Sequence, residues 1–114
     1  MKIAYLFLFV CVLLSCSAFE NENNEVTYRW KSDGLIVENG SSEAVYYAVF
    51  EQETLAHIFW VAVSTEENRI LPNTFIKIDK DEVLGYEEGK KIVLFYWTGT
   101  EHPFEFFENV VIET

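Results

Sequence analysis

The sequence predicts an all-β domain built as a two-sheet sandwich of about seven strands. Short apolar runs, alternating or apolar on both faces, recur between turn signals over roughly 90 residues. Aromatic residues make up 17% of the chain, and aromatic side chains favour strands. Neither cysteine lies beyond position 16, so the rest of the chain has no disulfide and must be held by its core.

The first strands follow from patterns with a period of two. Val26–Lys31 alternates apolar and polar residues, which is typical of a half-buried strand. Leu35–Glu38 is a second strand, after a turn in which we expect Gly34 to use positive φ. An Asn-Gly pair at 39–40 then signals a hairpin turn. Glu43–Glu51 is apolar on both faces, which favours a central strand.

The segment 52–63 fits a helical period and a strand period equally. We expect a helical turn near Glu53–Ala56, followed by a strand from Trp60 to Val63. After a polar loop, further strands are predicted at Thr74–Ile78, Lys90–Trp97 and Phe104–Ile112, the last with a bulge at Glu108-Asn109.

Four aromatic residues carry a resemblance. Tyr46 and Tyr47, in a strand that follows a turn, and Tyr96 with Trp97, in a late strand, are similar to those of bacterial immunoglobulin-like domains. The resemblance covers residues 26–112 and implies an immunoglobulin-like sandwich. The cysteine pair and intervening Trp of true immunoglobulin domains are absent. A likeness of fold by itself implies no activity.

The beginning of the chain carries a different pattern. Residues 3–14 are apolar and uncharged, directly behind Lys2. A helix of that length covers about 18 Å, which is short of a bilayer core of roughly 30 Å. A short apolar run behind a cation and before small residues is typical of a secretory signal rather than a membrane span.

The run Leu13-Leu14-Ser15-Cys16 resembles the lipobox of bacterial lipoproteins. The resemblance implies removal of residues 1–15 as a signal peptide and attachment of lipid to Cys16. Two or more acyl chains on one residue give stable anchoring. The lipobox resemblance also implies a location in the bacterial cell envelope, and Ser17 directly after Cys16 implies the outer membrane. The alternative is an ordinary secretory cut near Ser17-Ala18.

The resulting organisation is a lipidated Cys16 with a flexible acidic tether over residues 16–25, and a sandwich domain over residues 26–114. The acids of the tether resemble the surface-export signals of Bacteroidetes lipoproteins, with a solvated linker as the alternative. Without residues 1–15, 7 of the 8 Lys and Arg residues and all 19 acids remain, a net charge of −12. Nucleic acid is excluded as a partner, since its binding needs cations that neutralise phosphates.

Residues that catalysis needs are sparse. The only histidines, His57 and His102, lie far apart in the sequence, and no serine stands in a G-x-S-x-G motif. The acidic run 79–82 lacks the glycine and the spacing of an EF-hand loop. We therefore predict no enzymatic activity, no cofactor and no metal site.

The aromatic residues are the remaining indication of function. We predict a non-enzymatic module that binds a protein or a glycan, held at the membrane through the lipid on Cys16. The candidate ligand-binding residues are Trp30, Tyr47 and Trp97. The alternative for these side chains is burial, in the core or under the crossover 52–63. The alternative function is a structural or accessory subunit that joins an envelope complex through an exposed edge strand.

Overall fold

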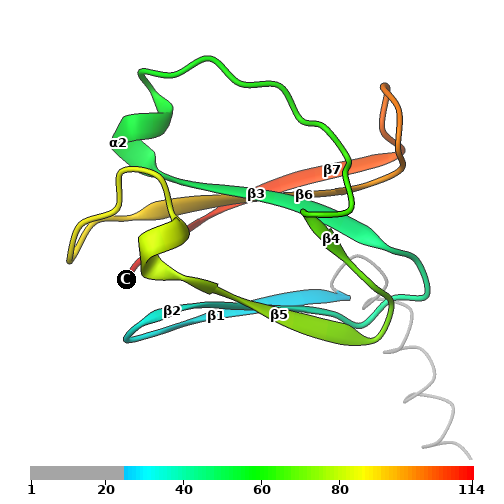
Figure 1. Cartoon of the computed structure of the whole chain (residues 1–114), viewed down its shortest axis with the longest axis horizontal. Helices are drawn as coiled ribbons and strands as arrows, with labels where there is room; N and C mark the ends of the chain where they lie inside the picture. Colours follow the sequence, from blue (N-terminus) through cyan, green and yellow to red (C-terminus); the bar gives the residue numbers. More distant parts are fainter. Residues whose placement is uncertain (1–24) are drawn as a thin grey trace, which may run out of the picture.

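The computed structural model describes residues 25–114 and contains seven strands in two antiparallel sheets (Figure 1). The strands are β1 (Val26–Lys31), β2 (Gly34–Asn39), β3 (Val45–Glu51), β4 (Arg69–Ile70), β5 (Thr74–Asp79), β6 (Ile92–Thr98) and β7 (Phe106–Ile112). One sheet has the order β1-β2-β5 and the other the order β4-β3-β6-β7. The expected signal peptide, Cys16 and the tether up to residue 24 lie outside the described residues.

This architecture confirms the predicted all-β, two-sheet sandwich. The strand order is that of an immunoglobulin constant-type sandwich in which the fourth strand has moved to the other sheet, beside the third. β1 has the bounds that the alternation predicts, and β2, β3, β5, β6 and β7 differ from their predicted bounds by at most two residues at either end. A period of two in the sequence was sufficient to locate these strands.

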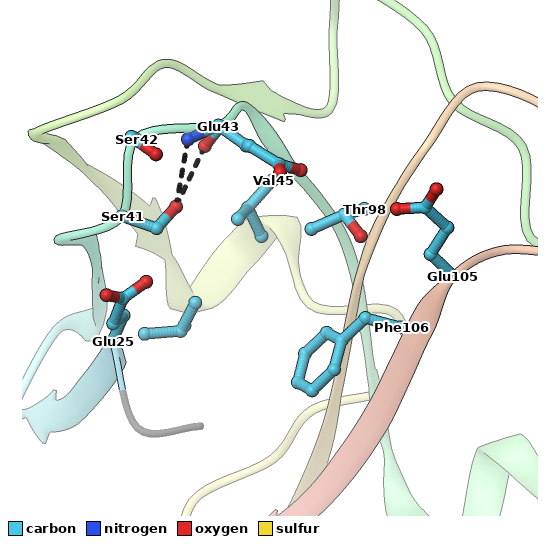
Figure 2. A pocket seen from close by; sticks show the side chains of 9 residues that line it. Glu25, Ser41, Ser42, Glu43, Val45, Thr98, Glu105 and Phe106 are labelled. Atoms are coloured by element: carbon cyan, nitrogen blue, oxygen red, sulfur yellow. Dashed lines mark hydrogen bonds between the residues drawn. The ribbon is translucent and has the colours of Figure 1, made fainter. Parts of the chain in front are cut away.

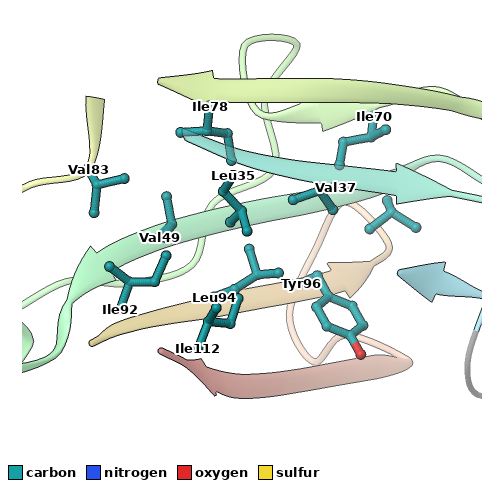
Figure 3. Close-up of a cluster of buried hydrophobic side chains, with 11 residues drawn as sticks. Leu35, Val37, Val49, Ile70, Ile78, Val83, Ile92, Leu94, Tyr96 and Ile112 are labelled. Atoms are coloured by element: carbon teal, nitrogen blue, oxygen red, sulfur yellow. The ribbon is translucent and has the colours of Figure 1, made fainter. Parts of the chain in front are cut away.

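The inter-sheet core is mainly aliphatic (Figure 3). Leu35 and Val37 of β2 and Ile78 of β5 meet Ile92 and Leu94 of β6 between the sheets. All five side chains are at most 3% exposed. Because strand side chains alternate between faces, the residues of one strand that enter this layer stand an even number of positions apart. The remaining buried members are Val45, Val49, Ile70, Val83, Tyr96 and Ile112.

Gly34 is required for a reason other than the predicted one. The glycines with positive φ among the described residues are Gly85, Gly89 and Gly99, so Gly34 does not use a left-handed turn conformation. A Cβ at Gly34 would lie 2.5 Å from the carbonyl oxygen of Ile78 in β5. Glycine therefore lets the backbones of β2 and β5 approach each other closely.

Asn39 is fully buried where the chain passes from one sheet to the other. Its Nδ2 donates to the carbonyl oxygens of Glu43 (2.8 Å), Ile70 (3.0 Å) and Leu71 (3.3 Å). Its Oδ1 accepts hydrogen bonds from the amide and the hydroxyl of Ser41. The pair 39–40 therefore belongs to a passage between sheets, and the predicted hairpin turn is wrong, because β2 and β3 lie in different sheets.

Two short helices join the strands, α2 (Gln52–Leu55) and η3 (Lys80–Glu82). Glu51 caps α2, because its carboxylate accepts hydrogen bonds from the amides of Glu53 (2.8 Å) and Thr54 (2.9 Å). These bonds hold the pKa of Glu51 below its ordinary value. The helical turn expected here is confirmed. Within residues 25–114, no helix is long and apolar enough to cross a membrane.

The strand predicted from Trp60 to Val63 is wrong. Residues 56–68, named the arch below, pass over the face of the four-stranded sheet that is turned away from the three-stranded sheet (Figure 1). We call this the outer face. The fourth strand is instead the two-residue β4. The side chains of the arch nevertheless alternate in direction: Trp60 and Ala62 face the sheet, while Phe59, Val61 and Val63 face solvent.

β7 keeps an unbroken register with β6 over all seven of its residues. The bulge predicted at Glu108-Asn109 is therefore wrong. Phe106, Val110 and Ile112 pack against the inter-sheet core, and Glu108 shares their face by the period of two but stays exposed. Glu108 is exposed because the sandwich is open along this strand, and its carboxylate does not mark a change in the alternation of β7.

Candidate functional site

The outer face of the four-stranded sheet carries a second apolar layer, which is mostly aromatic. Tyr46 of β3 and Trp97 of β6, directly opposite each other in the register, are buried there together with Ala62 of the arch. Partly buried side chains surround these three: Ala48, Trp60, Phe95 and Phe104. β3 and β6 are thus covered on both faces, which explains why their sequences are apolar at consecutive positions.

The rings of this layer form a connected set. The Trp60 ring centroid lies 4.8 Å from that of Phe95 and 6.4 Å from that of Trp97. Trp97 in turn stacks on Phe104 at 5.6 Å and on Phe107 at 5.7 Å. Aromatic pairs at such distances contribute beyond their buried area, by about 0.5–1.5 kcal/mol each. The arch and the loop 99–105 are therefore fixed to the sheet through aromatic contacts.

An open cleft with a volume of about 460 Å³ lies beside this layer, and aromatic side chains dominate its lining. The lining residues are Trp60, Ala62, His102, Pro103, Phe104 and Phe107. His102 Nε2 donates a hydrogen bond to the carbonyl oxygen of Ala62 (2.9 Å), and the His102 ring lies 4.2 Å from that of Phe104. His102 therefore links the loop to the arch along the wall of the cleft.

The solvent side of the arch adds a stripe of exposed apolar side chains. Phe59 is 93% exposed, and Val61 and Val63 are each 57% exposed. Within the described part of the chain, no amide or carbonyl of residues 59–63 pairs with another backbone group. The carbonyls of Ala62 and Val63 accept side-chain hydrogen bonds from His102 and Asn68. The arch is thus a single extended segment with one face packed and the other bare.

Trp97 was predicted to present a ring to a ligand, and this prediction is wrong. Its side chain is 0% exposed beneath the arch. Its Nε1 donates to Ser64 Oγ of the arch (2.9 Å), and Ser64 Oγ donates to the Gly99 carbonyl oxygen (2.7 Å). Trp97 is instead the support on which Phe104 and Phe107 stack. The structure matches the alternative given for Trp97, burial under the crossover that follows residue 52.

Trp30 and Tyr47 lie apart from the cleft. Both are half-buried and pack against the inter-sheet core, and the Trp30 ring lies 5.3 Å from that of Tyr86. Burial raises the pKa of the Tyr47 phenol above its ordinary value, and the nearby Glu82 carboxylate adds to this shift. The structure therefore does not bring the three candidate residues together, because Trp97 lies on the opposite face of its sheet.

The residues that do form the cleft were not singled out from the sequence. Trp60 was assigned to a strand, and Phe104 and Phe107 to the last strand. Two local signals were present: the unbroken apolar run Phe59–Val63, and three Phe residues within 104–107. Neither signal tells which segments far apart in the chain face each other.

A second concavity of about 300 Å³ lies at the end of the sandwich where the chain enters at Glu25 (Figure 2). Its carboxylates come from Glu25, Glu43 and Glu105, and the Ser41 hydroxyl bonds the backbone of Glu43 (Figure 2). The acidic run 79–82 uses the Glu82 carboxylate to accept the Asp79 amide (3.0 Å). Across residues 25–114, no three His, Cys, Asp or Glu side chains are grouped so that they could hold a metal ion.

Comparison with protein-family models, with curated proteins and with solved structures finds no match for this chain.

Proposed function

We propose that this protein is a membrane-anchored lipoprotein of the bacterial cell envelope that binds a protein or glycan ligand without chemical conversion. The ligand site is the cleft between the arch and the loop 99–105. Lipid on Cys16 holds the protein at the membrane, and the acidic tether sets its reach. The observation that carries the proposal is that one arch lines an aromatic cleft with Trp60 and Ala62 and exposes the stripe of Phe59, Val61 and Val63 on its other side.

The apolar character of this surface supports recognition. Monomeric proteins leave few contiguous apolar patches exposed, and larger ones mark interaction sites. Three large apolar side chains on one short segment do not contribute to either buried layer, since they face solvent. A protein ligand fits the aliphatic stripe best, whereas a glycan would use the ring faces of Trp60 and Phe104 alone.

The lining of the cleft supports binding over catalysis. His102 is the one titratable side chain among the six lining residues. Its Nε2 already donates to the Ala62 carbonyl, so that proton is engaged in holding the arch. General acid–base catalysis needs a group within hydrogen-bond reach of the substrate and with a free proton site. The cleft offers surface and shape, but no second polar group to complete such a pair.

The cleft is tested by capture of ligand from native membrane extracts with the full chain. We expect Phe59→Ser and Phe104→Ala each to reduce capture at least tenfold. Phe75→Ser is the matched control, because Phe75 is 64% exposed on β5 of the other sheet. Protease treatment of the extract abolishes capture of a protein ligand and spares a glycan. Equal capture by all variants would contradict the proposal.

The anchor is tested separately through Cys16→Ser. If lipid on Cys16 holds the protein, this change moves the protein from the membrane fraction to the soluble fraction and leaves residues 1–15 attached. Mass spectrometry of the parent chain should find acyl chains on Cys16. A variant that is still membrane-bound and still processed would contradict the lipid anchor.

A second candidate function is that of an accessory subunit joined through an edge strand. β7 favours it, because it forms one edge of the four-stranded sheet over seven residues, with Phe107 42% and Val111 47% exposed. An unpaired edge presents backbone donors and acceptors to another chain. Phe107 belongs to both surfaces, so the two candidates are separated by variants elsewhere, at Phe59 for the cleft and at Val111 for the edge.

A further inference from the structure

The four edges of the two sheets are protected unequally. β1 carries Arg29 and Lys31, β5 carries Lys77, and β4 is only two residues long, all of which discourage pairing with another chain. β7 has seven residues, without a cation, a proline or a bulge. Its outer face carries Phe107 and Val111, the two large apolar side chains of this strand that are most exposed. β7 is therefore the edge most open to strand addition.

We propose that β7 pairs with β7 of a second copy of this chain, antiparallel and around a two-fold axis at Asn109. The two four-stranded sheets then join into one continuous sheet. This proposal rests on the second candidate function, and it names the partner. A two-fold pairing requires one surface that complements itself, and the sequence of β7 satisfies that requirement in one register.

With the axis at Asn109, Phe107 of each copy faces Val111 of the other. Both residues lie on the outer face, because they are four positions apart in a strand. The exposed aromatic ring thus covers the exposed β-branched side chain twice in one interface, and such cross-strand pairs are stabilising. On the inner face, Phe106 faces Ile112. Phe106, Phe107, Val111 and Ile112 each gain an apolar neighbour in this register, while Val110 faces Glu108 of the second copy.

The neighbouring registers lack this complementarity. An axis at Glu108 would set two carboxylates directly opposite each other, and like charges in that position are destabilising. An axis at Val110 would set Phe107 against Glu113. A register with the axis between two residues would place outer-face residues of one copy opposite inner-face residues of the other. The chemistry of the strand therefore selects the axis at Asn109.

Charge limits the strength of the pair. Just beyond the strand ends, Glu105 faces Glu113 of the second copy, and the whole chain has a net charge of −11. A single strand pair also buries less than the roughly 1,200 Å² of a standard stable interface. We expect weak pairing in dilute solution, stronger pairing at high ionic strength, and stronger pairing still where chains are confined to a membrane.

Pairing at β7 also adds to the cleft. Phe107 lines the cleft, so Val111 of the second copy comes to lie beside the lining. Each copy thus contributes a residue to the rim of the other site. The two clefts then belong to one outer surface that runs across the joined sheet.

Single-cysteine cross-linking in membranes tests both the partner and the register. Full-length chains carrying Asn109→Cys, Glu108→Cys or Val110→Cys are oxidised and separated without reductant. Residues directly opposite in an antiparallel pair have Cα atoms about 4.5–5.5 Å apart, which a disulfide can span. We expect a covalent dimer from Asn109→Cys in at least tenfold greater yield than from the other two variants. The parent chain, with Cys11 and Cys16, measures the background.

A second substitution distinguishes specific pairing from random collision. Val111→Asp in the Asn109→Cys background should lower the yield at least tenfold, and higher ionic strength should raise the yield of the parent variant. Leu71→Asp is the matched control, since Leu71 is 51% exposed directly after β4, at the opposite edge of the sheet from β7. Equal yields from the three cysteine variants, no yield above background, or a yield unchanged by Val111→Asp each overturn the proposal. Ligand capture is measured separately with Phe59→Ser, which lies outside β7, so a failure of pairing and a failure of the cleft are distinguishable.

Discussion

The two faces of the four-stranded sheet bury apolar side chains by different means. The inner face packs against another sheet, with aliphatic residues such as Leu94 at 0% exposure. The outer face packs against the arch, whose central residues 59–63 form no backbone–backbone hydrogen bond within the described range. Its buried members are few, and aromatic rings such as Trp60 and Phe104 are only partly covered.

The difference follows from the element that covers each face, a whole sheet on the inner face and one segment on the outer face. A second sheet covers a whole face, so branched aliphatic side chains can fill the space between two regular surfaces. One extended segment covers only a strip, so large rings must spread from it to exclude water, and their edges stay accessible. The same incompleteness that makes the outer layer a weaker core makes it a surface for recognition.

Charge placed on either face of β6 should have the largest effect. Leu94→Asp and Val93→Asp introduce an unpaired carboxylate on the inner and the outer face, at 0% and 5% exposure. We expect Leu94→Asp to prevent folding, measured as loss of the β-type circular dichroism spectrum. Val93→Asp should also be severe. A Val93→Asp chain that is as stable as the parent would show that the outer layer is not a core at all.

Removal of Trp97 should come next in size. Trp97→Ala empties a fully buried site and leaves the Ser64 hydroxyl without its donor. The cost is about 3–5 kcal/mol in the free energy of unfolding, measured by denaturant titration. Trp97→Phe, which keeps a ring under Phe104 but loses the indole N–H, should cost clearly less. Equal costs for the two would mean that the hydrogen bond and not the packing holds the arch.

Trp60→Ala should have a smaller effect on stability, because Trp60 is only partly buried. We expect a cost of about 1–2 kcal/mol, since burial is worth about 1.5–3 kcal/mol for a complete large apolar side chain. Ligand capture should fall far more than stability does. A full-sized loss of stability without a selective loss of capture would place Trp60 with the core instead of the cleft.

Phe59→Ser should leave the free energy of unfolding unchanged within about 0.5 kcal/mol, as is usual for surface sites. The Phe59 side chain is 93% exposed and has no role in either layer. Thermal melting is the measurement, with Phe95→Ser, on a ring half-buried within the outer layer, as the contrasting variant. If Phe59→Ser lowers the melting temperature as much as Phe95→Ser does, the exposed stripe stabilises the fold and is not a surface available for binding.

The sequence predicts the strands far better than their covers. In β6, Ile92 to Trp97 alternate between two buried faces, and this pattern alone requires a layer on each side of the strand. The sequence left open whether residues 60–63 pair as a strand or cover the sheet, because an unbroken apolar run fits both. A segment forms a strand only where another backbone lies beside it to pair with. The segments beside the arch come from distant parts of the sequence.

An aromatic binding surface was predicted from the sequence, but the cleft is lined by other residues than the predicted ones. Trp30 and Trp97 were chosen for ring size and strand position, yet one lies at the rim of the inner core and the other beneath the arch. The cleft instead depends on His102 meeting Ala62 across 40 positions, a contact that no local pattern encodes. Likewise, Asn39 is a turn signal locally, but the structure uses its side chain as a buried connector.

Asn39 also gives the sandwich a mechanical property. Its amide joins the carbonyls of Glu43, Ile70 and Leu71, so it ties together the two passages by which the chain changes sheets at this end. Val26 lies opposite Asn39 in the register, and the Glu25 carbonyl accepts the Gly40 amide (2.9 Å). A pull on the chain from its N-terminal side therefore enters the fold beside this tie. If the chain is anchored on that side, the load from a ligand held at the cleft would reach the β1–β2 pair and this tie before the rest of the domain.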